Sequence, residues 1–149
     1  MPTHYKGKPD EILALDTFIK LARSLNTVQG QLIPQLQKEF GITESQFGVL
    51  EALYHLGPLC LGQLGEKILR SGSNITTVVD NLERDKLVKR VRDDADRRVQ
   101  MVHITQRGDA LMERCVPVHV ARVTKRISVL SRDEQRELAR LCRKLGTAE

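Results

Sequence analysis

A run of apolar residues at helical spacing, followed by a switch to alternation, is the clearest pattern along this chain. Within residues 74–84 the apolar positions recur every three or four residues, at Ile75, Val78, Val79 and Leu82. This spacing predicts an amphipathic helix with one buried face. From Leu87 onward apolar and polar residues alternate, and residues 99–104 are again β-rich. We therefore expect a helix that leads directly into a two-stranded hairpin.

The opposite face of this helix differs from an ordinary solvated face, which favours Glu and Lys. Its side chains are mostly short hydroxyls and amides: Ser73, Asn74, Thr76, Thr77, Asp80, Asn81 and Arg84. Such side chains approach base edges and phosphates closely, as Asn does with adenine and Thr with the thymine methyl group. A cap at Ser71 or Ser73 would leave the first amides of the helix free to meet a phosphate. The pattern favours a helix that reads DNA over a polar face in contact with water alone.

Helical patterns precede this segment. Residues 9–40 carry the first, in which Gly30 and Pro34 predict a bend or break. Residues 44–56 carry the second, and residues 61–69 line a short third helix. The short helix would brace the reading helix after an intervening turn, which is the order of a helix-turn-helix.

Two further helices follow the hairpin. The first begins at Thr105 and runs to Ile127, with Pro117 inside it, where we expect a kink. The second ends at Gly146. Capping boxes, in which the first and fourth residues satisfy each other's amides, are predicted at Thr43-Glu44-Ser45-Gln46 and Ser131-Arg132-Asp133-Glu134.

The predicted fold class is mainly α with a small β wing. Residues 42–105 would form a winged helix DNA-binding lobe, and residues 9–40 and 106–147 would be dimerisation helices, all within a single chain of 149 residues. The flanking helices carry more aliphatic residues than the lobe needs for its own core, so we expect them to meet a second copy. A two-fold homodimer would place two reading helices about one DNA turn apart, matched to a palindromic operator.

An ordered set of motifs runs through the chain: Ile75-Thr76, Val79, Leu82-Glu83, Leu87-Val88-x-Arg90, Asp96-x-Arg98, Val102-x-Ile104-Thr105 and Gly108. The run GVLEALYHLGPL upstream and the motif Leu130-Ser131-x-x-Glu134-x-x-x-Leu138 downstream extend it. The set resembles the MarR family of dimeric winged helix-turn-helix transcription regulators. In one position the chain departs from the family: Lys86 stands where the family usually has a Gly that ends the helix in a left-handed conformation.

The resemblance implies a homodimeric repressor that leaves DNA when a small, commonly phenolic or anionic, effector binds between the dimerisation helices and the lobe. Aromatic and histidine residues are the candidates for such a pocket, chiefly Phe18, Tyr54, His55 and His119, with Tyr5 and Phe47 as further possibilities. Plain core packing explains these residues equally well. The sequence does not separate the two explanations.

The charge of the chain agrees with an anionic partner. The net charge is +5, and basic residues cluster at Arg84, Lys86, Lys89, Arg90, Arg92, Arg97 and Arg98. The resemblance points to Arg98 as a minor-groove contact at the wing tip, whereas an ion pair with Asp96 is the alternative. The predicted DNA-binding residues are Ser71, Ser73, Asn74, Thr76, Thr77, Asn81, Arg84, Arg97 and Arg98.

Other chemistries find less support. Cys60, Cys115 and Cys142 show no close pair, so we expect free thiols in a reducing compartment and a structural role. Some members of the family sense peroxide through a cysteine on the first helix, where this chain has none. Cys115 and His119 have a usable metal-ligand spacing, but two ligands make no site, and we predict neither a metal nor another cofactor.

We predict that the chain is not an enzyme, because no Ser-His-Asp order, Gly-rich phosphate loop or metal-ligand cluster stands out. No run approaches the length of a membrane span and no signal-like apolar segment is found, so we expect a cytoplasmic protein without a membrane partner. The competing hypothesis is a winged-helix adaptor that binds proteins and has no specific affinity for DNA.

Overall fold

The computed structural model describes residues 4–68, 74–96 and 98–147. Along these residues the elements follow in the order α1 (Pro9–Phe40), α2 (Glu44–Leu56), β1 (Leu59–Cys60), α3 (Leu61–Lys67), α4 (Ile75–Arg84), β2 (Val88–Arg92), β3 (Gln100–Ile104), α5 (Gln106–Ile127) and α6 (Arg132–Gly146). The fold is mainly helical with a small antiparallel sheet, as predicted.

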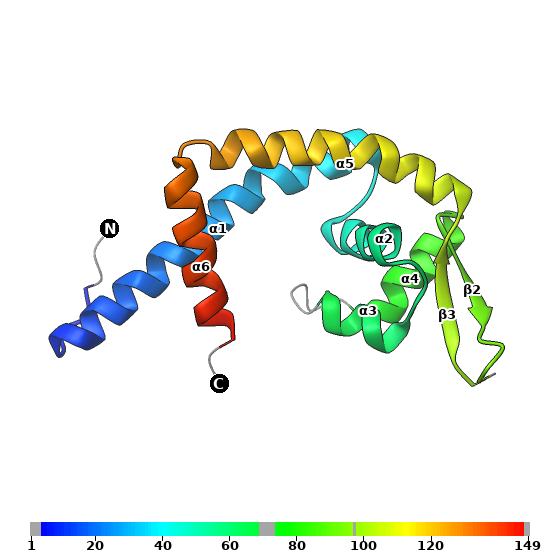
Figure 1. Ribbon diagram of the computed structural model, residues 1–149, viewed down its shortest axis with the longest axis horizontal. Coiled ribbons are helices and arrows are strands. Elements are labelled where there is room, and N and C mark those ends of the chain that lie inside the picture. The colour runs from blue at the N-terminus through cyan, green and yellow to red at the C-terminus, as the bar shows by residue number, and fades with distance from the viewer. Residues whose placement is uncertain (1–3, 69–73, 97, 148–149) are drawn as a thin grey trace.

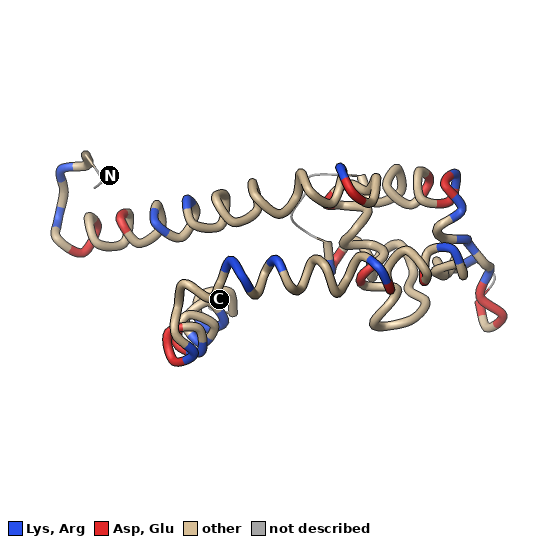
Figure 2. Tube along the Cα trace, turned by 90° about the horizontal axis from the view of Figure 1, so that it is seen from above, with Lys and Arg blue, Asp and Glu red and all other residues tan. Residues whose placement is uncertain are grey.

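The molecule is elongated, with a lobe at one end and the outer half of α1 together with α6 at the other (Figure 1). The C-terminal part of α1 and α5 pack together and join the two ends. The lobe consists of α2, α3, α4 and the sheet, while α6 overlaps the outer half of α1 in this view and is separated from it in depth (Figures 1 and 2). The outer helices therefore lie away from the lobe, where they could hold a partner without covering α4.

The core lies in the lobe and is built of aliphatic residues. Side chains from α2, α3, α4, both wing strands and α5 are fully buried: Val49, Leu50, Leu53, Leu64, Val79, Leu82, Val88, Val102, Met112 and Cys115. Each buried aliphatic side chain contributes on the order of 1.5–3 kcal/mol relative to an exposed one. The predicted inner face of α4 is confirmed, because Val78, Val79 and Leu82 are buried and Ile75 is half-buried.

The predicted two-stranded hairpin is part of a three-stranded sheet in the order β1-β3-β2. The hairpin itself pairs Val88 with Ile104 and Arg92 with Gln100. The added strand β1 pairs Leu59 with Val102 on the other side of β3. At two residues, β1 is too short to show a period-2 pattern, which is why the sequence did not reveal it.

The two predicted capping boxes are both present at the starts of α2 and α6. In both capping boxes the hydroxyl accepts from the fourth residue and that residue's side chain accepts from the cap amide: Thr43 with Gln46, and Ser131 with Glu134. The short helix α3 ends at Lys67 instead of residue 69.

The predicted break in the first helix does not occur, because α1 runs unbroken through Gly30 and Pro34. A proline removes one ladder hydrogen bond and crowds the carbonyl of residue i−4, which here belongs to Gly30. The helix continues on both sides, and Leu36 is buried in the core two residues after Pro34. Tertiary packing therefore outweighs the local cost of the proline.

The turn from α4 into the wing depends on a left-handed residue that is not glycine. Lys86 has a φ of 61°. Among the described residues, it is the non-glycine residue with a positive φ. Its amide donates to the Glu83 carbonyl at 2.9 Å and the Leu87 amide donates to the Leu82 carbonyl at 2.9 Å. These two bonds form a Schellman cap with Lys86 in the position that glycine usually takes.

The start of α5 locks this turn in place. The Thr105 hydroxyl donates to the Lys86 carbonyl at 2.8 Å, and the Thr105 amide donates to the Leu87 carbonyl at 3.0 Å. A Cβ on Gly108 would lie 2.3 Å from that same Leu87 carbonyl oxygen, so only glycine allows this approach. The wing, α4 and α5 are therefore joined at one point.

Candidate nucleic-acid interface and ligand cavity

The exposed face of α4 carries the short polar side chains that the sequence placed there. Thr76, Thr77 and Arg84 are exposed and Asn81 is half-buried. Ser71, Ser73 and Arg97 lie outside the described residues. The exposed threonines and Arg84 can reach a groove or a backbone without disturbing the core.

Asn74 caps α4, a role that we predicted for Ser71 or Ser73. Its side-chain Oδ1 accepts the Thr76 amide at 2.9 Å and caps α4. The cap uses one acceptor position of this oxygen, and the amide NH₂ group keeps both donors for a contact with DNA. Asn74 thus couples the start of the reading helix to the predicted interface.

The tip of the hairpin is a charged turn that presents Arg98 to solvent. The Asp96 carboxylate accepts from the Arg98 side chain at 3.1 Å and from the Arg98 amide at 3.0 Å. The Arg98 side chain lowers the pKa of Asp96, and the backbone bond lowers it further. The Arg98 side chain remains 91% exposed. The ion pair that was the alternative for Arg98 therefore exists, and it leaves the guanidinium accessible at the tip.

Arg90 joins the hairpin to α4 through hydrogen bonds and ion pairs. The Arg90 guanidinium donates to Asp80 at 2.5 Å and to Glu83 at 2.6 Å, and the Arg90 amide donates to Glu83 at 3.0 Å. The Arg90 side chain is only 16% exposed. Two carboxylates of α4 thus neutralise Arg90, so it fixes the wing and adds no free charge to the basic surface. From the sequence, we placed Arg90 in the basic cluster and did not predict its pairing with Asp80 and Glu83.

Basic residues gather around the hairpin and the adjacent start of α5, with acidic residues at the hairpin tip (Figure 2). The hairpin projects at the same end of the molecule as α3 and α4 (Figure 1). A phosphate backbone is attracted to free cations on such a surface, while a neutralised cation contributes little.

A cavity of about 690 Å³ lies where α1, α2, α3 and α5 converge. Its apolar lining consists of Leu32, Ile33, Leu36, Phe47, Ala52, Leu56 and Ile68. Its polar lining consists of Gln29, Glu44, Ser45, Glu51, His55, Glu66, Lys67 and His119. Its volume lies within the range of pockets that hold small organic ligands.

The cavity brings together two of the four chief effector candidates. His55 and His119 line it, and the His119 ring lies 4.7 Å from the Phe47 ring. Burial lowers the pKa of His119, so its neutral form predominates near neutral pH. Phe18 lies on α1 with 66% of its surface exposed, and Tyr54 is half-buried against the core, with its ring 5.1 Å from that of His55.

The three cysteines are free thiols, and they differ in how far they are buried. Cys115 is buried in the core, where burial raises the pKa of its thiol. Cys142 is exposed on α6, and Cys60 precedes α3, where its amide donates to Gln63. Within the described residues no three metal-binding side chains come together, and no helix is long and apolar enough to cross a bilayer.

Known proteins resemble this chain in sequence. The sequence profile of the MarR family matches residues 42–99. The HTH-type transcriptional regulator MhqR from Bacillus subtilis is 36% identical over 133 residues, which covers 89% of this chain and 91% of that protein. The chain belongs to the MarR family. Its relatives are transcription regulators and not enzymes.

Two solved structures of family members share the fold over most of their length. MepR from S. aureus, in a complex with DNA, is 26% identical, covers 88% of this chain and 98% of its own, and superposes with a TM-score of 0.74. BpsR from Bordetella bronchiseptica, whose DNA binding is regulated by 6-hydroxynicotinic acid, is 25% identical. The match covers 85% of this chain and 98% of BpsR, with a TM-score of 0.71. This MarR-family chain is thus a winged-helix regulator of transcription.

Proposed function

We propose that this MarR-family regulator is a homodimeric repressor that reads a palindromic operator and releases it on binding a small molecule. The observation that carries the proposal is the pairing of two surfaces in one lobe: the threonine-rich face of α4 and the exposed guanidinium of Arg98 at the wing tip. MepR, which shares this fold, is known in complex with DNA.

The two surfaces suit different parts of a duplex. The major groove admits a helix and presents a distinct donor and acceptor pattern at each base pair, which Thr76 and Thr77 can read. The minor groove distinguishes mainly A·T from G·C pairs, and a narrow minor groove attracts arginine. We therefore assign base reading to α4 and a flanking minor-groove contact to Arg98. Ser71, Ser73, Asn81, Arg84 and Arg97 complete the proposed interface.

A second copy would cover the apolar surface at the outer end of the molecule. None of the described residues of α6 is buried, although Leu138, Leu141 and Leu145 form an apolar stripe along it. On α1, Leu13 is 64% exposed and Phe18 is 66% exposed. Contiguous exposed apolar residues of this kind mark an interaction surface. We place the dimer contact at residues 9–40 and 106–147, which leaves residues 42–105 for DNA.

The cavity between α1, α2, α3 and α5 is the proposed effector site. It joins the dimerisation helices to the lobe, so a molecule that fills it can favour one lobe orientation over another. A coupling of about 1–3 kcal/mol between the two sites would weaken DNA binding by roughly 5–150-fold. Regulation of BpsR by 6-hydroxynicotinic acid shows that a protein of this fold responds to a small molecule.

Sequencing genomic DNA captured by the purified full-length protein tests the proposal. We expect an inverted repeat whose half-sites lie about one helical turn apart, 10–10.5 base pairs from centre to centre or a multiple of that. Captured fragments without a shared repeat, together with binding that does not change with salt, would favour the adaptor without specific DNA affinity.

A further inference from the structure

The charges around the 690 Å³ cavity are opposite to those expected for an anionic effector. Its described lining contains three carboxylates, Glu44, Glu51 and Glu66, against one ammonium group, that of Lys67. No described lining residue is an arginine. Sites that hold carboxylates or phosphates usually present guanidinium groups in pairs of hydrogen bonds.

The three carboxylates belong to exposed residues that line the cavity, and their recorded contacts are few. Glu44 accepts a hydrogen bond from the Gln29 amide at 3.2 Å, and a neutral donor leaves its charge in place. Within the described residues, Glu51 and Glu66 have no ion pair. The pKa of His119 is lowered by burial, so this ring does not add a compensating cation near neutral pH.

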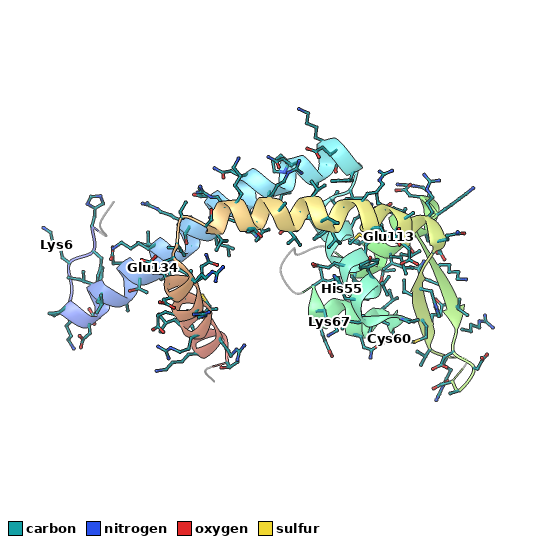
Figure 3. All side chains as sticks on the ribbon, turned by 45° about the horizontal axis from the view of Figure 1, so that its top comes forward. Lys6, His55, Cys60, Lys67, Glu113 and Glu134 are labelled. Carbon is teal, nitrogen blue, oxygen red and sulfur yellow. The ribbon has the colours of Figure 1, made fainter. Side chains whose placement is uncertain are left out.

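Figure 3 shows His55 and Lys67 on the side of the lobe away from the hairpin, with Glu113 on α5 outside this group. The cavity is thus separate from the DNA-facing cations. Its deeper walls, which include Leu36 and Phe47, are buried and apolar. An apolar guest can fill these walls while its polar end meets the carboxylates.

We propose that the cavity selects a hydrophobic cation: an aromatic or aliphatic frame that carries an amine or quaternary ammonium group. The inference rests on the proposed effector site and names the chemistry that it takes. A cation is attracted by the glutamates, whereas a carboxylate is repelled by them. The preference is specific to the cavity, because the whole chain has a net charge of +5 and would attract anions in general.

A matched set of probes tests the proposal by direct calorimetry on the intact protein at low ionic strength. The set is 2-naphthylmethylamine, 2-naphthalenemethanol and 2-naphthoate, which share a ring system and differ in charge. We expect the amine to bind tightest and the carboxylate weakest, with about a tenfold spread or more between them. Equal binding of all three, tightest binding of the carboxylate, or no binding of any probe would overturn the proposal.

Charge variants show whether the cavity causes the preference. Glu51→Gln combined with Glu66→Gln should shrink the spread severalfold, while Glu113→Gln, on an exposed residue of α5 outside the cavity, should leave it unchanged. Thermal melts check that the variants remain folded. A spread that survives the double substitution would contradict the assignment to these carboxylates.

Retardation of operator DNA, measured separately, distinguishes this inference from the proposed function. If the amine binds tightest but leaves DNA affinity unchanged, the charge preference stands and the release mechanism fails. If the carboxylate binds tightest and releases DNA, the release mechanism stands and the charge preference fails.

Discussion

At the scale of single residues, neighbouring polar side chains on α4 have separate tasks. Asn74 caps the helix through its Oδ1, whereas the Thr77 side chain is exposed and makes no hydrogen bond to the described part of the chain. Residue type alone does not distinguish them, because Asn, Ser and Thr all cap helices and all contact bases. The distinction depends on where the first turn of α4 begins.

Alanine substitutions should separate the two tasks. Asn74→Ala should lower the free energy of unfolding by about 0.5–2 kcal/mol because the Thr76 amide loses its partner. Thr77→Ala should change stability by less than about 0.5 kcal/mol, yet cost about 1–3 kcal/mol of discrimination at particular operator positions. Urea denaturation and binding to single-base operator variants measure these quantities. A stability loss in Thr77→Ala equal to that in Asn74→Ala would refute the division.

Lys86 offers a second prediction at this scale. A left-handed conformation costs a non-glycine residue roughly 1–2 kcal/mol, and Lys86 adopts it with φ 61°. Lys86→Gly should therefore raise stability by about 1 kcal/mol and the melting temperature by about 2–4 °C. The control Lys89→Gly, on strand β2, should lower stability instead. Calorimetric melts of both variants check the sign, and a destabilised Lys86→Gly would contradict the strained cap.

At the scale of elements, Arg90 joins the wing to the reading helix through Asp80 and Glu83. Because two carboxylates neutralise it, Arg90 should act by position and not by its charge toward DNA. Arg98 has one carboxylate partner and remains exposed, so its charge is available to phosphates. The two arginines of one hairpin therefore make opposite predictions for the salt dependence of binding.

Arg90→Gln should weaken operator binding while the slope of log affinity against log salt stays unchanged. Arg98→Ala should weaken binding to most sequences and reduce that slope by roughly one charge unit, because a cation near the phosphates, which releases counterions, is lost. Affinities measured across a salt series decide between the two roles. If Arg90→Gln lowers the slope as Arg98→Ala does, Arg90 contacts the backbone of DNA directly.

Local chemistry made several elements predictable from sequence. The apolar period of α4 and the capping box at Thr43 both involve residues close in the chain. Features that depend on distant segments were not predictable. The pairing of Arg90 requires the hairpin to fold back on α4, and Phe47 joins His119 only when α2 meets α5.

At the scale of the whole molecule, the account requires a dimer held by its outer helices. Leu138→Glu combined with Leu141→Glu should convert the protein to monomers or aggregates, because charges would enter the apolar stripe of α6. Arg136→Glu makes the same change in net charge on the exposed surface of α6 and should preserve the dimer. Deletion of residues 131–149 should match the double variant. Light scattering reports the mass, and a soluble, tight dimer in the double variant would place the interface elsewhere.

Two α4 helices held at a fixed separation constitute the central claim, and the spacing of half-sites tests it most directly. Dissociation constants would be measured on synthetic operators in which base pairs are inserted one at a time between the half-sites found by sequencing. We expect tight binding at the native spacing and a loss of about tenfold or more at five inserted pairs, roughly half a helical turn, because one α4 then faces away from its groove. Affinity that is indifferent to the spacing would show that each copy binds DNA independently and would contradict the dimeric reading of the operator.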